Sequence, residues 1–286
     1  MAGALAAGPV AADIVLVGPD DLLPRIPARS RLGVGDWGSG VGEGNDPERE
    51  LAAGRLAARS IERAVWLARA GEVDAVVTAP VHKSALHRAG YRYPGVTEFL
   101  GALAGGVETV MMLVTGPLRV ALVTTHLPLR EALSQITTER VVRVGSIVRA
   151  ALRDRFDIPE PRIAVCALNP HAGEGGLFGD EDQRILAPAA RALGAAGPLP
   201  ADTVFVRGLR GEFDAVLAPY HDVGMTAVKV AGFGSGVNVT LGLPFVRTSP
   251  DHGTAFDIAG TGTADSGSMR AAIELAARLA RRPAER

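Results

Sequence analysis

Short apolar runs alternate along the chain with longer segments in which apolar residues recur at helical spacing. The short runs predict strands over 13–18, 74–80, 109–114, 119–125 and 238–241, and two further strands that end near His171 and His221. The helical spacing predicts helices over 50–70, 138–156, 183–193 and 266–282. A glycine-rich segment, 32–47, is predicted to be a flexible surface loop. Alternation of strands and helices predicts an α/β fold with a largely parallel sheet.

Three histidines follow apolar runs in three separate parts of the chain. His126 follows 120–125, His171 follows 163–168 and His221 follows 215–219. Ligands of open α/β sheets bind just beyond the carboxyl ends of the strands. Three imidazoles delivered there can hold one divalent metal ion, and nitrogen ligands suit Zn²⁺ or Co²⁺ better than Mg²⁺. The pattern therefore favours a metal site, although three unrelated histidines bonded to backbone would give the same spacing.

Composition narrows the class of protein. A chain of 286 residues is long enough for about two domains. The net charge of −1 and the pI near 6.6 favour neither a nucleic acid nor a membrane surface as partner. The single cysteine, Cys166, excludes an internal disulfide framework, and its apolar neighbours predict core packing rather than a reactive thiol. With no basic segment at the N-terminus to suggest a signal peptide, we expect a soluble cytoplasmic protein.

Lysine is rare in this chain, since 28 of its 30 basic residues are arginines and the two lysines are Lys83 and Lys229. Lysine is a compact point charge and can act as a base, whereas arginine does neither. Both lysines are predicted to lie in loops that follow strands. Lys229, Asn238 and Arg247 together form the best candidate set for binding a carboxylate or phosphate. Taken singly, each of the three is more often structural.

Two further segments carry polar residues beside a predicted helix. Thr97 follows Gly95 and opens a helical stretch, where it can cradle an anion or act as a simple N-cap. The segment 251–260 is a compact loop in which small residues would let a flat ring approach the backbone. His252 or Asp257 could then form hydrogen bonds with the edge of the ring. Neither a Gly-x-Gly-x-x-Gly motif opening a helix nor a phosphate-binding Walker loop is present, so a Rossmann module is not supported.

Several motifs of the chain resemble, in order, the signature blocks of one family. They are Thr78-Ala79-Pro80-Val81-His82-Lys83, Thr97-Glu98-Phe99, Thr124-Thr125-His126-Leu127-Pro128-Leu129, Asn169-Pro170-His171-Ala172-Gly173-Glu174-Gly175-Gly176, Gly197-Pro198-Leu199-Pro200-Ala201-Asp202-Thr203, Tyr220-His221-Asp222, Gly236-Val237-Asn238-Val239-Thr240-Leu241-Gly242-Leu243-Pro244 and Arg247-Thr248-Ser249. These blocks are similar to those of the 4-hydroxythreonine-4-phosphate dehydrogenase (PdxA) family of vitamin B6 biosynthesis. The resemblance extends from about residue 72 to the C-terminus.

The resemblance implies an isocitrate/isopropylmalate-dehydrogenase-like fold of two α/β/α domains with a cleft between them. The first domain would comprise 1–90 and 253–286, and the second 91–252. It also implies a homodimer with a shared active site, in which one metal ligand comes from the partner subunit. The reaction implied is metal-dependent oxidation of a phosphorylated hydroxy acid by NAD or NADP, followed by decarboxylation of the 3-oxo product.

The resemblance also assigns residues to roles. His126, His171 and His221 match the metal ligands, and Thr97, Lys229, Asn238 and Arg247 match substrate-binding residues. The segment His252, Gly253, Thr254 to Asp257 is similar to the adenosine-binding loop of isocitrate and isopropylmalate dehydrogenases. Lys229 and Asp222 are the candidate catalytic residues, with Lys229 as the candidate base.

Two departures from the family pattern leave the substrate and the activity open. Val96 stands where the family has a substrate-binding histidine. The family also opens with a strand and a Gly-Asp-Pro loop on the cofactor side, which this sequence lacks, so we expect either a misplaced start or impaired cofactor binding. The alternatives are a threonate or erythronate 4-phosphate dehydrogenase, a cis-dihydrodiol dehydrogenase, or a metal- and anion-binding homologue without redox activity.

Overall fold

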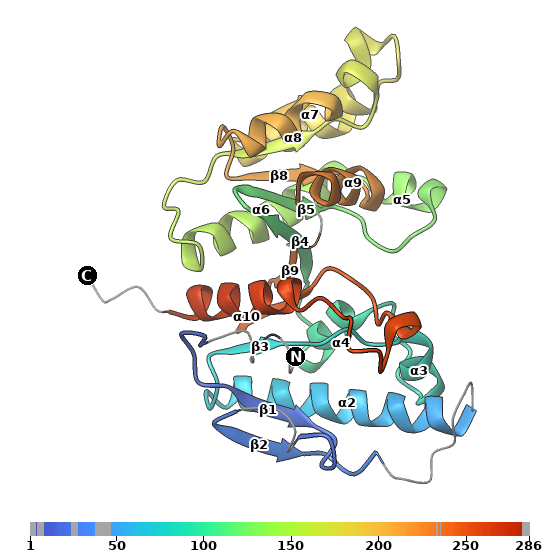
Figure 1. Ribbon diagram of the computed structural model, residues 1–286. Helices are drawn as coiled ribbons and strands as arrows, with labels where there is room; N and C mark the ends of the chain where they lie inside the picture. Colours follow the sequence, from blue (N-terminus) through green and yellow to red (C-terminus); the bar gives the residue numbers. More distant parts are fainter. Residues whose placement is uncertain are drawn as a thin grey trace. The chain divides into compact units, whose positions relative to one another are not determined.

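A computed structural model of the chain describes residues 4, 9–23, 28–37, 47–232, 234 and 236–281 (Figure 1). The chain forms two compact units, the first from Met1–Thr109 and Leu243–Arg281, the second from Val110–Gly242. The predicted domain boundaries at 90 and 253 differ from these. Residues 91–109 and 243–252 belong to the first unit, because Phe99, Leu100, Leu243 and Phe245 share one apolar cluster with its longest helix.

The first unit begins with a pair of parallel strands, β1 (Val15–Gly18) and β2 (Ser30–Gly33). The remaining elements are α2 (Pro47–Arg69), β3 (Ala75–Val77), α3 (Lys83–Arg88), α4 (Val96–Leu103), β10 (Val246–Pro250), the short helix η4 (Phe256–Ile258) and α10 (Gly267–Ala280). Most of the predicted loop 32–47 lies outside the described residues, and its first two residues belong to β2.

Strand β3 pairs in parallel with β10 and is covered on both faces. Val76 packs in the cluster built by α2 and α4, whereas its neighbour Val77 packs with Met269 and Ile273 of α10. Successive side chains of a strand point to opposite faces. Val76 therefore contacts α2 and α4 on one face of the strand, and Val77 contacts α10 on the other. Gly54 of α2 allows α3 to approach closely, because an added Cβ would lie 1.9 Å from the carbonyl oxygen of Ala85.

The described residues of the second unit form six strands and the helices between them. They are β4 (Val110–Thr115), β5 (Leu118–Leu122), α5 (Leu129–Gln135), α6 (Thr138–Asp154), β6 (Ile163–Cys166), η2 (Pro170–Gly176), η3 (Asp182–Leu186), α7 (Ala187–Leu193), β7 (Ala196–Leu199), α8 (Ala201–Leu209), β8 (Ala215–Ala218), α9 (His221–Gly232) and β9 (Val237–Leu241). Their order in the sheet is β9-β4-β5-β8-β6-β7. Strand β4 is antiparallel to β5 and β9, and the other pairs are parallel.

Helices cover both faces of this sheet. Val120 and Leu122 of β5 pack in one cluster with Val204 of α8 and Val228 of α9. Helix α6 contacts β4, β5, β8 and β9, and none of its described buried residues belongs to that cluster. We therefore place α6 on the opposite face, which makes the second unit an α/β/α sandwich.

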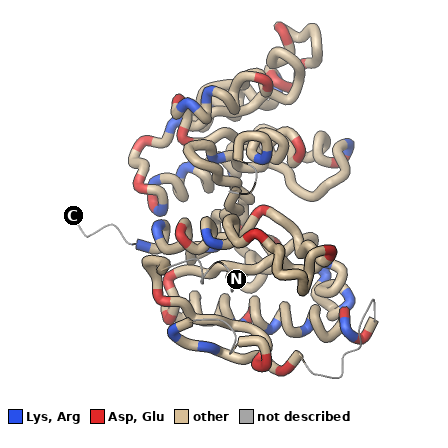
Figure 2. The backbone as a smooth tube through the Cα atoms, in the orientation of Figure 1, with Lys and Arg blue, Asp and Glu red and all other residues tan. Residues whose placement is uncertain are grey.

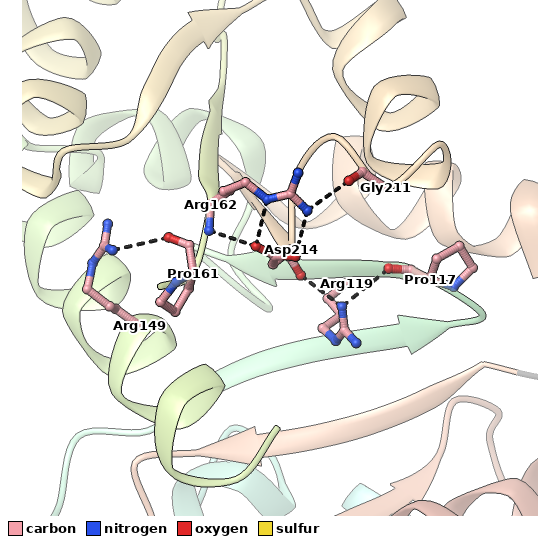
Figure 3. Close-up of polar contacts among 7 residues, drawn as sticks. All are labelled: Pro117, Arg119, Arg149, Pro161, Arg162, Gly211 and Asp214. Atoms are coloured by element: carbon pink, nitrogen blue, oxygen red, sulfur yellow. Dashed lines mark hydrogen bonds and ion pairs between the residues drawn. The ribbon is translucent and has the colours of Figure 1, made fainter. Parts of the chain in front are cut away.

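An arginine-rich cluster joins the amino ends of β5, β6 and β8 (Figure 3). The Asp214 carboxylate accepts hydrogen bonds from the backbone N–H of Arg162 at 2.8 Å and from its guanidinium at 3.0 Å and 3.2 Å. Arg119 donates to the carbonyl of Asp214 at 3.1 Å, and Arg162 donates to that of Gly211 at 2.8 Å. Because strand order places these ends side by side, the cluster fixes them at the end opposite to the three histidines.

The predicted α/β class is confirmed, and the predicted strands and helices are present with small shifts at their ends. Strands β2, β7 and β10 and helices α3, α5, α8 and α9 were not predicted, and Lys83 opens α3 rather than lying in the predicted loop. Charged residues of both signs are interspersed within each unit (Figure 2). Among the described residues, no helix is long and apolar enough to cross a membrane.

Candidate active site

The candidate site of the second unit lies at the carboxyl ends of three adjacent parallel strands. Strand β8 pairs with β5 on one side and with β6 on the other. His126 follows β5, His221 opens α9 directly after β8, and His171 lies in η2 after β6. The sheet thus brings the three histidine-bearing segments to one edge, as the position of each His after an apolar run predicts.

Two of the three imidazoles lie close together. The ring centroids of His126 and His221 are 5.7 Å apart. Their segments are joined by two contacts: the buried Thr124 hydroxyl donates to the carbonyl of Pro219 at 2.9 Å, and the N–H of Val123 donates to that of Ala218 at 2.9 Å. The adjacent ends of β5 and β8 therefore set the separation of the two rings.

The His221 ring is held by the next residue. Its Nδ1 atom lies 2.7 Å from a carboxylate oxygen of Asp222. A carboxylate on one ring nitrogen fixes the tautomer and orientation of a histidine whose other nitrogen binds a metal. Asp222 is 85% exposed, so solvent reaches this carboxylate from outside.

The third histidine occupies an unusual turn. His171, Ala172, Gly173, Glu174 and Gly175 all have positive φ values, from 41° to 82°. The His171 ring lies 6.3 Å from that of Phe178. Within the described part of the chain, no three His, Cys, Asp or Glu side chains form a group that could hold a metal. One chain therefore supplies a pair of neighbouring imidazoles, and a three-histidine site stays a prediction.

The predicted anion-binding residues lie on regular elements in both units. Lys229 is an exposed residue in the last turn of α9, so the prediction of a loop at this position is wrong. A helix continues here because the apolar residues of 221–232 recur at helical spacing and pack on the sheet through Val228. Asn238 lies in β9, where its buried Oδ1 has no hydrogen-bond partner among the described residues. Thr97 lies in the first turn of α4.

Arg247 is a buried cation. It lies in β10, is 3% exposed, and donates a hydrogen bond from its guanidinium to Thr78 Oγ1. Burial lowers the pKa of Arg247 to about 10, against the opposing effect of the Glu98 charge. The guanidinium therefore stays positive at neutral pH, and a buried positive charge is stabilised by an anion.

Glu98 is a charged group near Arg247 that our sequence reasoning left out of the site. One of its carboxylate oxygens is buried without a hydrogen-bond partner among the residues that the structure describes. Its position in the first turn of α4 does not by itself indicate a binding role, because an acidic residue there is usually explained by the helix dipole.

The predicted cofactor loop is exposed. His252 Nδ1 lies 2.9 Å from the carbonyl oxygen of Gly253, and Ala255 takes a left-handed conformation with φ of 47°. Phe256 is 63% exposed, and its ring contacts that of His82 edge to face at 5.1 Å. Gly253, Thr254 and Asp257 lie in the same segment, with Gly253 and Asp257 exposed. This leaves an aromatic edge and polar groups available to a flat ligand.

The single cysteine is not part of this chemistry. Cys166 is fully buried in β6, as its apolar neighbours predict. Burial, followed by the charge of Asp182, raises the pKa of the thiol to about 12. A thiol in this environment is a poor nucleophile, so the core role predicted for Cys166 is confirmed.

The chain is similar to known proteins over most of its length. Residues 44–276 match the family model described as pyridoxal phosphate biosynthetic protein PdxA. A 4-hydroxythreonine-4-phosphate dehydrogenase from Bradyrhizobium diazoefficiens is 52% identical over 247 residues, which cover 83% of this chain and 71% of that protein. A D-threonate 4-phosphate dehydrogenase from Salmonella typhimurium is 51% identical over 236 residues, covering 81% of this chain and 72% of that protein.

A solved structure shows the same fold. The crystal structure of 4-hydroxythreonine-4-phosphate dehydrogenase from Klebsiella pneumoniae superposes with a TM-score of 0.85 at 43% identity, covering 97% of this chain and 92% of that one. The sequence motifs, the α/β fold and these identities agree. The chain therefore belongs to the family of the pyridoxal phosphate biosynthetic protein PdxA, a family of dehydrogenases.

Proposed function

We propose that this protein oxidises the secondary hydroxyl of a phosphorylated hydroxy acid with NAD or NADP, and that the 3-oxo acid formed then loses carbon dioxide. The observation that carries the proposal is the buried guanidinium of Arg247, a cation at neutral pH whose N–H groups suit the oxygens of a phosphate or carboxylate. Arg247, Lys229 and Asn238 carry two cations and an amide, and each of these groups suits a phosphate or a carboxylate.

Two substrates fit this description. The relatives named above act on 4-hydroxythreonine 4-phosphate and on D-threonate 4-phosphate, which differ in carrying an amino group or a hydroxyl group beside the carboxylate. Val96 stands where the family has a substrate-binding histidine, so one polar contact to substrate is missing in this chain. We propose 4-hydroxythreonine 4-phosphate as the substrate. The alternative is D-threonate 4-phosphate, which is supported by the similarity to the Salmonella protein.

The histidine pair fits a divalent metal. His126 and His221 present two imidazoles 5.7 Å apart, and Asp222 fixes the orientation of one of them. Neutral nitrogen ligands of this kind suit Zn²⁺ or Co²⁺ and tolerate Mg²⁺ less well. A bound divalent ion would lower the pKa of the substrate hydroxyl and polarise the neighbouring carbonyl. We propose that His171 completes the site and that one of the three ligands comes from the partner subunit of a homodimer.

The proton and hydride are assigned to different groups. Oxidation removes a proton from the hydroxyl oxygen and a hydride from its carbon, and NAD or NADP would accept the hydride. Lys229 lies about 12 Å beyond His221 along α9, so its flexible side chain has to reach back to serve as the base. Asp222 touches His221 instead, and we assign it to positioning that ring rather than to proton removal.

The exposed loop of His252, Gly253, Thr254 and Asp257 is the proposed binding site for the adenosine part of the cofactor. Two features support this proposal. The Phe256 ring is exposed, and the left-handed turn at Ala255 exposes the backbone beside it. Nicotinamide nucleotides and phosphorylated acids are charged metabolites that cells retain, which supports a cytoplasmic location.

The test is a dehydrogenase assay with a small panel of substrates. The purified protein, loaded with Zn²⁺ or Co²⁺, is supplied with NAD or NADP and with 4-hydroxythreonine 4-phosphate, threonate and erythronate 4-phosphates, unphosphorylated threonate, or a cis-dihydrodiol. We expect reduced nucleotide with a phosphorylated acid, none with unphosphorylated threonate, and none from a folded His126→Ala variant. Saturable binding of metal and phosphate with no nucleotide affinity would instead support a binding protein without redox activity.

A further inference from the structure

The segment that carries His171 is held in a backbone conformation that ordinary residues avoid. Five successive residues, 171–175, lie in the left-handed region, and three of them (His171, Ala172 and Glu174) are not glycine. Each such residue costs about 1 kcal/mol or more. Strain of this kind persists only where the surrounding structure over-determines the conformation.

A buried carboxylate fastens the start of this segment. Asp182, the first residue of η3, is 0% exposed. Its two oxygens accept hydrogen bonds from the backbone N–H groups of Leu168 at 2.8 Å and Asn169 at 3.0 Å. Asp182 therefore fixes the backbone at the exit of β6, immediately before His171.

Two further contacts tie the same loop. The Asn169 side chain donates to a carboxylate oxygen of Glu181 at 2.8 Å. A Cβ added to Gly173 would lie 2.9 Å from the carbonyl oxygen of Gly179 and 3.7 Å from a carboxylate oxygen of Asp182. The turn of 171–175 is thus packed directly on the segment 179–182.

Asp182 has no cationic partner within the described residues. Two backbone N–H donors stabilise its charge instead, and each would lose its acceptor if the carboxylate were removed. A buried carboxylate is costly unless its hydrogen bonds are made. Here the Asp182 carboxylate accepts these bonds from the backbone that positions a candidate metal ligand.

We propose that Asp182 is a positioning residue that holds the His171 segment in its left-handed turn and thereby sets the affinity of the metal site. This inference rests on the proposed role of His171 in metal binding. Asp182 touches neither substrate nor metal in this scheme, and it acts through the backbone of Leu168 and Asn169.

The experiment measures metal affinity directly, on the full-length protein without substrate. Co²⁺ is titrated into the wild type, Asp182→Asn and His171→Ala, and its visible absorption bands report binding. Asp182→Asn keeps the shape of the side chain but replaces one acceptor oxygen with an NH₂ group, which cannot accept from a backbone N–H. We expect Co²⁺ affinity to fall about tenfold or more, as for other supporting groups of metal ligands.

Two controls separate positioning from general loss of stability. Asp180→Asn changes an exposed aspartate that pairs with Arg184, and we expect unchanged Co²⁺ affinity. Asp214→Asn weakens the same unit at the opposite ends of the strands, and we expect lower stability with unchanged Co²⁺ affinity. If Asp182→Asn fails to fold, Asp182→Ser keeps one acceptor without added bulk and takes its place.

The outcomes distinguish this inference from the proposed metal site. Weaker binding in both His171→Ala and the Asp182 variant, with the controls unchanged, supports the positioning role. Wild-type affinity in the Asp182 variant, with weak binding in His171→Ala, overturns it. Wild-type affinity in His171→Ala refutes the proposed metal site itself, and the positioning role with it.

Discussion

Arg247 illustrates, at the scale of single residues, how burial changes the meaning of a charge. Arginine is the common cation of this sequence, so its type alone says little. At 3% exposure, with a hydrogen bond to Thr78, it becomes a buried cation, unlike the surface arginines of the chain. The sequence reasoning named Arg247 as an anion-binding residue, but only the structure shows that its guanidinium is buried and that Glu98 lies near it.

We predict that Arg247→Lys lowers kcat/KM for the phosphorylated substrate about 10- to 100-fold, since a charge-assisted hydrogen bond contributes about 1.5–3 kcal/mol. Lysine keeps the charge but cannot form the planar, two-bond contact with an oxyanion. Steady-state kinetics check this, with Arg184→Lys on the surface as the matched control. A folded variant with wild-type kcat/KM would remove Arg247 from the site.

At the scale of elements, strand order brings the histidine-bearing segments to one edge, and an N-cap stabilises a helix that packs on the sheet. Strands β5, β8 and β6 are separated along the chain, yet they lie side by side and deliver their histidines to one edge. Helix α6 supports this sheet. Its N-cap, Thr137, accepts a hydrogen bond from the N–H of Arg140 at 3.2 Å.

We predict that Thr137→Ala destabilises the protein by about 1 kcal/mol, the usual cost of losing an N-cap side chain. The cap satisfies one of the N–H groups that a helix start leaves without a partner. Urea denaturation measures the change, and Thr137→Ser, which keeps the hydroxyl, should stay close to wild type. Equal losses for alanine and serine would show that the methyl group, and not the cap, is responsible.

At the scale of the whole molecule, each unit has its own apolar cluster, and in the second unit a polar cluster also joins distant segments. Asp214, Arg162 and Arg119 connect three strands whose residues lie far apart in the sequence (Figure 3). Burial would raise the pKa of Asp214, but its hydrogen bonds from Arg162 and the charges of Arg162 and Arg119 outweigh that and hold the pKa below its usual value. The carboxylate therefore contributes to stability only while it is ionised.

The stability lost in Asp214→Asn should depend on pH. Because the folded pKa lies below the unfolded value of about 3.9, the stabilisation is complete above that value and disappears as the pH falls through the folded pKa. We expect a loss of about 1 kcal/mol at neutral pH, allowing for solvent screening of the exposed Arg162. Urea denaturation from pH 7 to pH 3 checks this. Glu212→Gln, in an exposed pair with Arg207, serves as the control, and a loss independent of pH would indicate packing instead.

By itself the sequence determined the α/β class, most strands and helices, the family, and the edge of the sheet at which the histidine-bearing segments lie. These follow from local periodicity and from the rule that ligands bind beyond the ends of parallel strands. The sequence did not predict β10, because residues 246–250 mix polar and apolar types although all five are buried. Helix α9 was not predicted, because Gly224 and several β-branched residues give its sequence a low helix propensity.

Only the tertiary structure decided which side chains meet. It placed His126 beside His221, set His171 in a left-handed turn, and put Asp182 beneath that turn. The physical reason is that periodicity reports which face of a segment is buried, whereas contacts between distant segments depend on strand order, register and turn geometry. A buried carboxylate bonded to backbone looks in sequence like any other aspartate, so its role becomes visible only once its partners are in place.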